Sequence, residues 1–182
     1  MAPGEHVLYF ALRPSPEAAR AALALGGRLC AARGLKAPLT PADRLHVSLN
    51  CVGVFHRVPE EVVDGARRAA EAVRGRRFTV AFNRLAGWGR GPGPRPVVLA
   101  GDEGVIGVEA LHAAIHARLA AFGMVRGRLR QFWPHMTLLW DQAPVPETMV
   151  APISWRVADF VLVDAFHGSG RRRILGAWPL SG

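Results

Sequence analysis

The sequence has 182 residues, of which 50% are hydrophobic and 20% are charged. This composition is typical of a folded domain and argues against intrinsic disorder. The longest N-terminal apolar stretch, residues 7–12, is much shorter than the ~20 residues of a membrane span and has no features of a secretory signal. We therefore expect a single cytoplasmic domain that needs no membrane and no partner chain, and hence a monomer.

The charge is strongly basic, with 23 Lys+Arg against 14 Asp+Glu and a formal net charge of +9. Lys36 is the single lysine, so nearly all of the positive charge is carried by arginine. Guanidinium groups suit phosphate oxygens, which favours an anionic partner, most simply nucleic acid. The alternative is an arginine bias of a GC-rich genome, without functional meaning. Cys30 and Cys51 form no CxxC motif and predict no disulfide, as expected in a reducing cytoplasm.

The first half of the chain alternates strands and helices. Residues 7–12 are rich in β-formers and predict a strand, and Ser15 followed by Pro16 marks the start of a helix that ends near Arg33. Apolar periodicity predicts three more elements. They are a strand at 45–54, a helix at 59–74 and a strand at 78–83.

The second half repeats this order after a Gly- and Pro-rich crossover at 87–96. The predicted elements are an apolar run at 97–100, a helix at 105–122, a strand at 135–140, and two strands at 155–166 and 174–178 that flank a loop with Arg171, Arg172 and Arg173. Two similar halves, about 1–90 and 91–182, predict an α+β domain with mostly antiparallel sheets, in which the halves exchange elements.

One short pattern occurs in both halves. Residues 45–49 read LHVSL and residues 134–138 read PHMTL, so each copy has a histidine and, two residues later, a hydroxyl followed by leucine. Side chains alternate along a strand, so His46 and Ser48 share one face, as do His135 and Thr137, while the apolar residues face the core. Two imidazoles and two hydroxyls that converge on one cleft would suit metal-free phosphoryl transfer, with one histidine as base and the other as acid.

The two motifs resemble the paired H-x-[ST]-x motifs of the 2H phosphoesterase superfamily. In particular, the chain is similar over residues 7–180 to bacterial and archaeal RNA 2',3'-cyclic phosphodiesterases, which are also called 2'-5' RNA ligases. The likeness includes the opening LYFAL strand, ADRLH before the first motif, FWPH before the second, and the closing LGAWPL. It implies a bilobal fold of two pseudo-symmetric βα lobes around a central cleft.

The resemblance also implies the chemistry. The reaction would open an RNA 2',3'-cyclic phosphate to a 2'-phosphate without metal or other cofactor. A reversible ligation that forms 2'-5' bonds, with an RNA 5'-hydroxyl in the place of water, would be secondary. His46 would be the acid that protonates the departing 3' oxygen, and His135 the base that activates water. Ser48 and Thr137 would bind the nonbridging phosphate oxygens.

Two positions depart from the family pattern. The family usually has an arginine where this chain has Trp140, and we expect Arg130 to take over its contact with phosphate. An aromatic residue that is usual in the last hairpin is replaced here by Arg173. Two alternatives follow from these departures: a noncatalytic RNA-binding module of the same fold, and a phosphodiesterase for another small cyclic phosphate. For the enzyme, the expected ligands are RNA ends or small cyclic nucleotides.

Other residues have simpler interpretations. His112 and His116 have the i, i+4 spacing of a helical metal site, but they lack a third ligand, and we expect a half-buried helix edge without metal. Cys51 is expected to be a small buried residue on the core side of the first motif. Trp88 and Trp133 are candidates for stacking on a base.

Overall fold

The structure is a computed structural model that describes residues 4–89, 91–125, 128–129 and 131–182. Within this part of the chain it contains three α-helices and eight strands. The helices are α1 (Pro16–Arg33), α2 (Glu60–Glu71) and α3 (Ile106–Ala121). The strands are β1 (His6–Leu12), β2 (Val47–Phe55), β3 (Phe78–Gly87), β4 (Arg95–Ala100), β5 (His135–Asp141), β6 (Thr148–Val157), β7 (Asp159–Phe166) and β8 (Arg171–Pro179).

The eight strands form one antiparallel sheet in the order β6-β3-β4-β5-β2-β1-β7-β8. β2 and β5 meet at its middle through the pairing of Val47 with Met136. This pairing divides the sheet into two groups of four strands, β6-β3-β4-β5 and β2-β1-β7-β8. Each group combines strands from both halves of the sequence. The expected α+β class with antiparallel pairing is confirmed.

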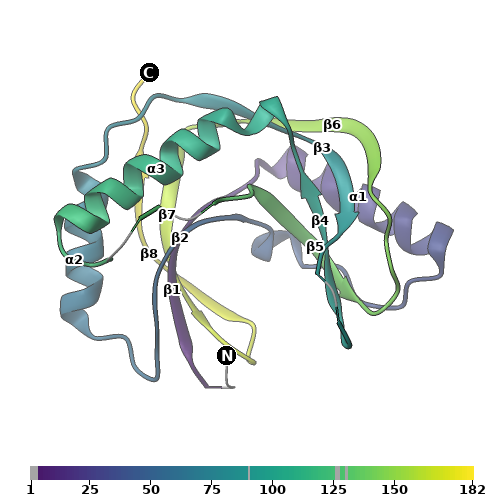
Figure 1. Cartoon of the computed structure of the whole chain (residues 1–182), viewed down its shortest axis with the longest axis horizontal. Helices are drawn as coiled ribbons and strands as arrows, with labels where there is room; N and C mark the ends of the chain where they lie inside the picture. The colour runs from purple at the N-terminus through teal and green to yellow at the C-terminus, as the bar shows by residue number, and fades with distance from the viewer. Residues whose placement is uncertain (1–3, 90, 126–127, 130) are drawn as a thin grey trace.

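The helices lie on the outer side of the bent sheet (Figure 1). α2 contacts β8, and α3 contacts α2, β2 and β3. α1 follows β1 in sequence but packs against β5 and β6 in the other group of strands. Ser15 caps α1 by accepting a hydrogen bond from the backbone N–H of Ala18 at 3.1 Å. None of the helices in the described ranges combines the length and hydropathy that a membrane crossing requires.

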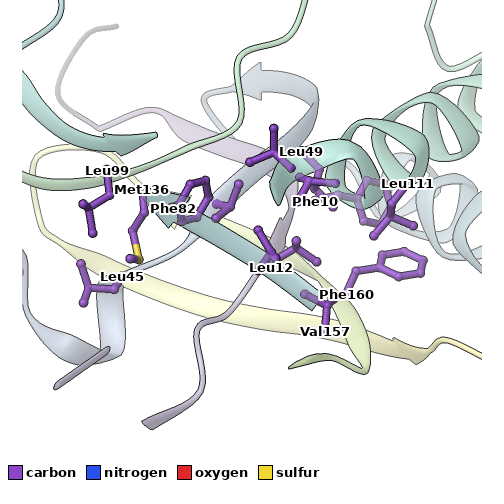
Figure 2. Close-up of a cluster of buried hydrophobic side chains, with 14 of the residues drawn as sticks. Phe10, Leu12, Leu45, Leu49, Phe82, Leu99, Leu111, Met136, Val157 and Phe160 are labelled. Carbon is purple, nitrogen blue, oxygen red and sulfur yellow. The ribbon is translucent and has the colours of Figure 1, made fainter. Parts of the chain in front are cut away.

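The main hydrophobic core lies between the sheet and the helices. Figure 2 shows Leu45, Leu99 and Met136 together on one side of this cluster. Met136 and Val47 are fully buried, so the apolar residues of both motifs face the core as the alternation predicts. This burial fixes the register, because a one-residue slip would turn each apolar set toward solvent.

The C-terminal strands differ from the prediction. The run 155–166 is divided at Ala158 into β6, which pairs with β3, and β7, which pairs with β1. The division is required because the chain changes here from one group of strands to the other. Arg171, Arg172 and Arg173 lie in β8 and not in a loop, because they pair with the end of β7.

Cys51 was also predicted wrongly, since it is exposed. The pairing of β1 with β2 shifts between Tyr9 and Ala11, whose partners are Cys51 and Ser48. One extra residue of β2 is accommodated in this bulge, which reverses the alternation beyond it. Cys51 therefore turns away from the core, although strict alternation would place it inside.

His112 packs as a core-edge residue. It is 9% exposed, lies 3.1 Å through Nδ1 from the carbonyl oxygen of Leu49, and stacks on Phe132 with ring centroids 4.0 Å apart. Because the carbonyl accepts, Nδ1–H of His112 is the donor. Within the described ranges, no group of three or more His, Cys, Asp or Glu side chains could hold a metal ion.

Candidate active site

The centre of the sheet brings the two motifs together. Val47 pairs with Met136 across β2 and β5. In an antiparallel pair, the residue before one partner stands opposite the residue after the other, so His46 faces Thr137 and Ser48 faces His135. The two histidines are then diagonal neighbours, a relation in which residues lie ~7–8 Å apart and their Cβ atoms are somewhat closer. All four side chains lie on the face of the sheet opposite the buried Val47 and Met136.

Both imidazoles are anchored in the same way. His46 Nδ1 lies 2.8 Å from the carbonyl oxygen of Arg44, and His135 Nδ1 lies 2.7 Å from the carbonyl oxygen of Trp133. Each carbonyl belongs to the residue two positions before its histidine. Since a carbonyl oxygen only accepts, we assign the proton of each neutral ring to Nδ1. Nε2 then carries the lone pair, which can accept a hydrogen bond.

Arg172 on β8 gives His46 a cationic neighbour. Its Nη1 donates to the carbonyl oxygen of Arg44 at 2.7 Å and lies 3.0 Å from Nδ1 of His46, so two donors share one carbonyl. Burial, followed by the charges of Arg172 and His135, lowers the pKa of His46 to about 4, although the hydrogen bond to Arg44 opposes this change. His46 is therefore neutral near pH 7.

Tyr9 completes the surroundings of His46. Its ring centroid is 5.4 Å from that of His46, and the side chain belongs to a small apolar cluster on β1 and β7 that is separate from the main core. Burial raises the pKa of the Tyr9 hydroxyl, and Arg172 opposes this effect. The wall beside His46 is thus apolar, with one guanidinium at its edge.

The surroundings of His135 are different. The Trp88 ring lies 4.7 Å from the His135 ring, centroid to centroid, at an interplanar angle of 55°. Trp133, whose carbonyl anchors His135, is 62% exposed. Both indoles line a cavity of about 550 Å³ on this side of the site. His135 therefore has aromatic neighbours where His46 has an arginine and a phenol.

The other candidates from the sequence have different outcomes. Arg130 lies outside the described residues, so its part in phosphate binding stays a prediction. Trp140 is 56% exposed and lines a shallow cavity with Lys36 and Asp141. The guanidinium that touches His46 comes from Arg172, whose place beside the motif was not predicted, because it is 126 residues away in sequence.

Comparisons with known proteins agree with this architecture. The crystal structure of E. coli LigT in its apo form matches with a TM-score of 0.77 and 23% identity, covering 98% of this chain and 99% of that chain. A structure from Thermus thermophilus matches with a TM-score of 0.75 and 21% identity over 97% and 98% of the two chains. These likenesses show the fold. Among curated proteins, none matches the chain significantly.

A family comparison extends the assignment from the fold to the family. The sequence model of the 2'-5' RNA ligase superfamily matches residues 6–165, which include both histidine motifs and most of the chain. Membership supports an enzyme that acts on phosphodiester bonds. The protein belongs to the 2'-5' RNA ligase superfamily, the group of 2H phosphoesterases.

Proposed function

We propose that the protein is a metal-independent phosphodiesterase that opens 2',3'-cyclic phosphate ends of RNA to 2'-phosphates. The observation that carries this proposal is the pair of imidazoles on β2 and β5, each held through Nδ1 by the carbonyl two residues before it. Each ring thus offers Nε2 to a ligand, and each faces the hydroxyl of the other motif. This is an acid–base pair with two hydrogen-bond donors between its members.

The reaction needs two proton transfers. The oxygen of a water molecule attacks phosphorus while one histidine takes a proton from that water through Nε2. The bond between phosphorus and the 3' oxygen breaks, and the other histidine gives its Nε2 proton to this oxygen. The products are a 2'-phosphate and a 3'-hydroxyl, and exchange with solvent returns both imidazoles to their starting protonation states.

The low pKa of His46 supports one assignment of these roles. A base must be neutral before the reaction, and His46 is neutral in the free protein at pH 7 because burial, Arg172 and His135 disfavour its cation. We therefore propose His46 as the base and His135 as the acid. This reverses the assignment that the resemblance implies, in which His46 is the acid.

Ser48 and Thr137 supply uncharged donors for the phosphate. Both stand on the face of the sheet that carries the histidines, and Ser48 is exposed. Their hydroxyls would donate to the nonbridging oxygens, where the charge increases as water adds. Similar solved structures of E. coli LigT hold 3'-AMP, ATP or phosphate, which supports a nucleotide ligand for this fold.

Ligation would use the same groups with another nucleophile. An RNA 5'-hydroxyl in the place of water, attacking the same cyclic phosphate, would form a 2'-5' bond. We propose ligation as a secondary activity, because water is far more concentrated than any RNA end.

The decisive experiment is incubation of the native protein with an oligonucleotide that ends in a 2',3'-cyclic phosphate. A 2'-phosphate product, formed at equal rates with and without chelator, is expected. Binding to RNA without turnover would instead support the noncatalytic module that the basic charge suggests. Turnover of other small cyclic phosphates in the same assay, with the RNA end untouched, would move the proposal to a different substrate.

A further inference from the structure

A cavity of about 550 Å³ opens beside His135 and has no role in the proton transfers described above. Its volume lies within the usual range of sites for small ligands. Two kinds of side chain dominate its walls, indoles and carboxylates. The indoles are those of Trp88 and Trp133, and the carboxylates are those of Asp102, Glu109 and Glu147. Arg84 also lines the cavity.

The charge of this cavity is opposite to that of the protein as a whole. The chain has a net charge of +9, yet three carboxylates and one guanidinium line these walls. Arg84 is occupied, since it forms ion pairs with Asp102 and with Glu147, the latter at 2.9 Å. Acidic walls disfavour a phosphate and favour a ligand that presents N–H donors.

Glu109 is the carboxylate that stays free for such a ligand. It lies in the first turn of α3, is exposed, and has no ion pair or side-chain hydrogen bond within the described part of the chain. Its neighbours Asp102 and Glu147 are both bound to Arg84. A ligand in the cavity therefore has one carboxylate available to accept hydrogen bonds.

The indoles indicate a flat aromatic ligand. Trp133 is 62% exposed, a large apolar surface that a stacked ring would cover. Trp88 touches the His135 ring at a centroid distance of 4.7 Å and also lines the cavity. Trp88 therefore connects the cavity with the imidazole that we propose to act on the phosphate.

We propose that this cavity binds the base of the terminal nucleotide and selects guanine. The proposal rests on the proposed function, because the base belongs to the nucleotide that carries the cyclic phosphate. Guanine places its N1–H and N2–H donors side by side, so both can donate to the Glu109 carboxylate while the ring stacks on Trp133. Adenine and cytosine have an amino group next to a bare ring nitrogen, and uracil has an N–H between two carbonyls, so each brings an acceptor toward the carboxylate.

Binding of the four nucleoside 2'-monophosphates to the native protein, measured by calorimetry, tests the preference without any turnover. Guanosine 2'-monophosphate is expected to bind about tenfold more tightly than the other three, the usual discrimination of a bidentate contact. Glu109→Gln should remove this preference, whereas Glu103→Gln, an exposed neighbour outside the cavity, should keep it. Equal affinities for the four bases, or an unchanged preference in Glu109→Gln, would overturn the proposal.

Stacking is tested separately. Trp133→Ala should weaken all four nucleotides about tenfold, because stacking does not depend on the base. Trp140→Ala removes a similarly exposed indole that lines another cavity and should leave the affinities unchanged. An unchanged affinity in Trp133→Ala would place the base elsewhere and overturn the site.

Turnover of four oligonucleotides that end in a 2',3'-cyclic phosphate and differ only in the terminal base separates this proposal from the proposed function. If none is hydrolysed while guanosine 2'-monophosphate still binds preferentially, the phosphodiesterase proposal fails and the guanine site stands. If all four are hydrolysed with equal kcat/KM and their products bind equally, the phosphodiesterase stands and the guanine site fails.

Discussion

His46 and His135 have the same backbone setting and different neighbours. Each donates Nδ1–H to the carbonyl two residues earlier, at 2.8 Å in one case and 2.7 Å in the other. His46 has Arg172 and Tyr9 beside it, and its pKa is lowered to about 4. His135 lies against Trp88 and an acid-lined cavity.

The different neighbours support different proposed roles for the two copies of the motif. The backbone anchor orients both rings alike, so orientation does not distinguish base from acid. The cation beside His46 disfavours its protonated form and suits the base, whereas the cavity beside His135 suits the binding of a ligand. Each prediction below tests one side of this difference.

The largest effect is expected from removal of either imidazole. His46→Ala and His135→Ala should each lower kcat/KM for a cyclic phosphate about 10²- to 10⁴-fold, the usual contribution of one acid or base. Circular dichroism and thermal unfolding check that each variant is folded. Full activity in one of the two folded variants would exclude the acid–base pair.

Loss of a motif hydroxyl should have a smaller effect. Ser48→Ala and Thr137→Ala should each lower kcat about 10- to 100-fold, as expected for a hydrogen bond to a charged group. Thr137→Ser keeps a donor on the same strand and should retain most of the activity. Equal rates in Thr137→Ala and Thr137→Ser would assign no donor role to the hydroxyl.

The charge beside His46 predicts a pH dependence. Because the pKa of His46 is about 4, the neutral base is lost as the pH falls through about 4, and kcat/KM should fall with it. Arg172→Gln removes one cause of the low pKa, so this acid limb should move to higher pH. In Arg171→Gln, the neighbouring position on β8 that points to the other face, it should stay in place.

The opposite dependence of kcat/KM on pH would support the assignment of His46 as the acid. If kcat/KM of the native protein falls as the pH rises above 4, protonated His46 is required and His46 is the acid. If the acid limb lies at the same pH in Arg172→Gln and in the native protein, Arg172 does not influence the protonation of His46.

The smallest effect is expected at the turn between β7 and β8. Gly170 has φ +66°, and a Cβ there would overlap the guanidinium of Arg44. The backbone carbonyl of the same residue accepts hydrogen bonds from His46 and Arg172. Gly170→Ala should lower stability by about 1–2 kcal/mol through its left-handed backbone and also reduce kcat/KM several-fold.

Gly123→Ala separates these two causes. Gly123 has φ +69° with no atom near the added Cβ, so the variant should lose similar stability and keep its activity. Thermal unfolding and kcat/KM, measured on both variants, give the comparison. Equal activity losses would assign the effect of Gly170→Ala to backbone strain alone.

Local patterns predicted much of the fold. The Ser15-Pro16 start placed α1, and alternation around Val47 and Met136 placed the motif strands with their apolar side inward. These features depend on neighbours along the chain, which a sequence displays directly. The prediction was wrong where pairing with a distant strand decides, as at the Cys51 bulge and in the arginine segment of β8.

The sequence by itself determined the candidate set: two histidines and two hydroxyls on the faces of two strands that point away from the core. Only the tertiary structure placed those strands side by side, at the pairing of Val47 with Met136. It also brought Arg172 to His46 across 126 residues and set Trp88 against His135. Strand alternation is local, whereas the charge and polarity around an imidazole depend on every element folded against it, so the asymmetry of the site is a property of the fold.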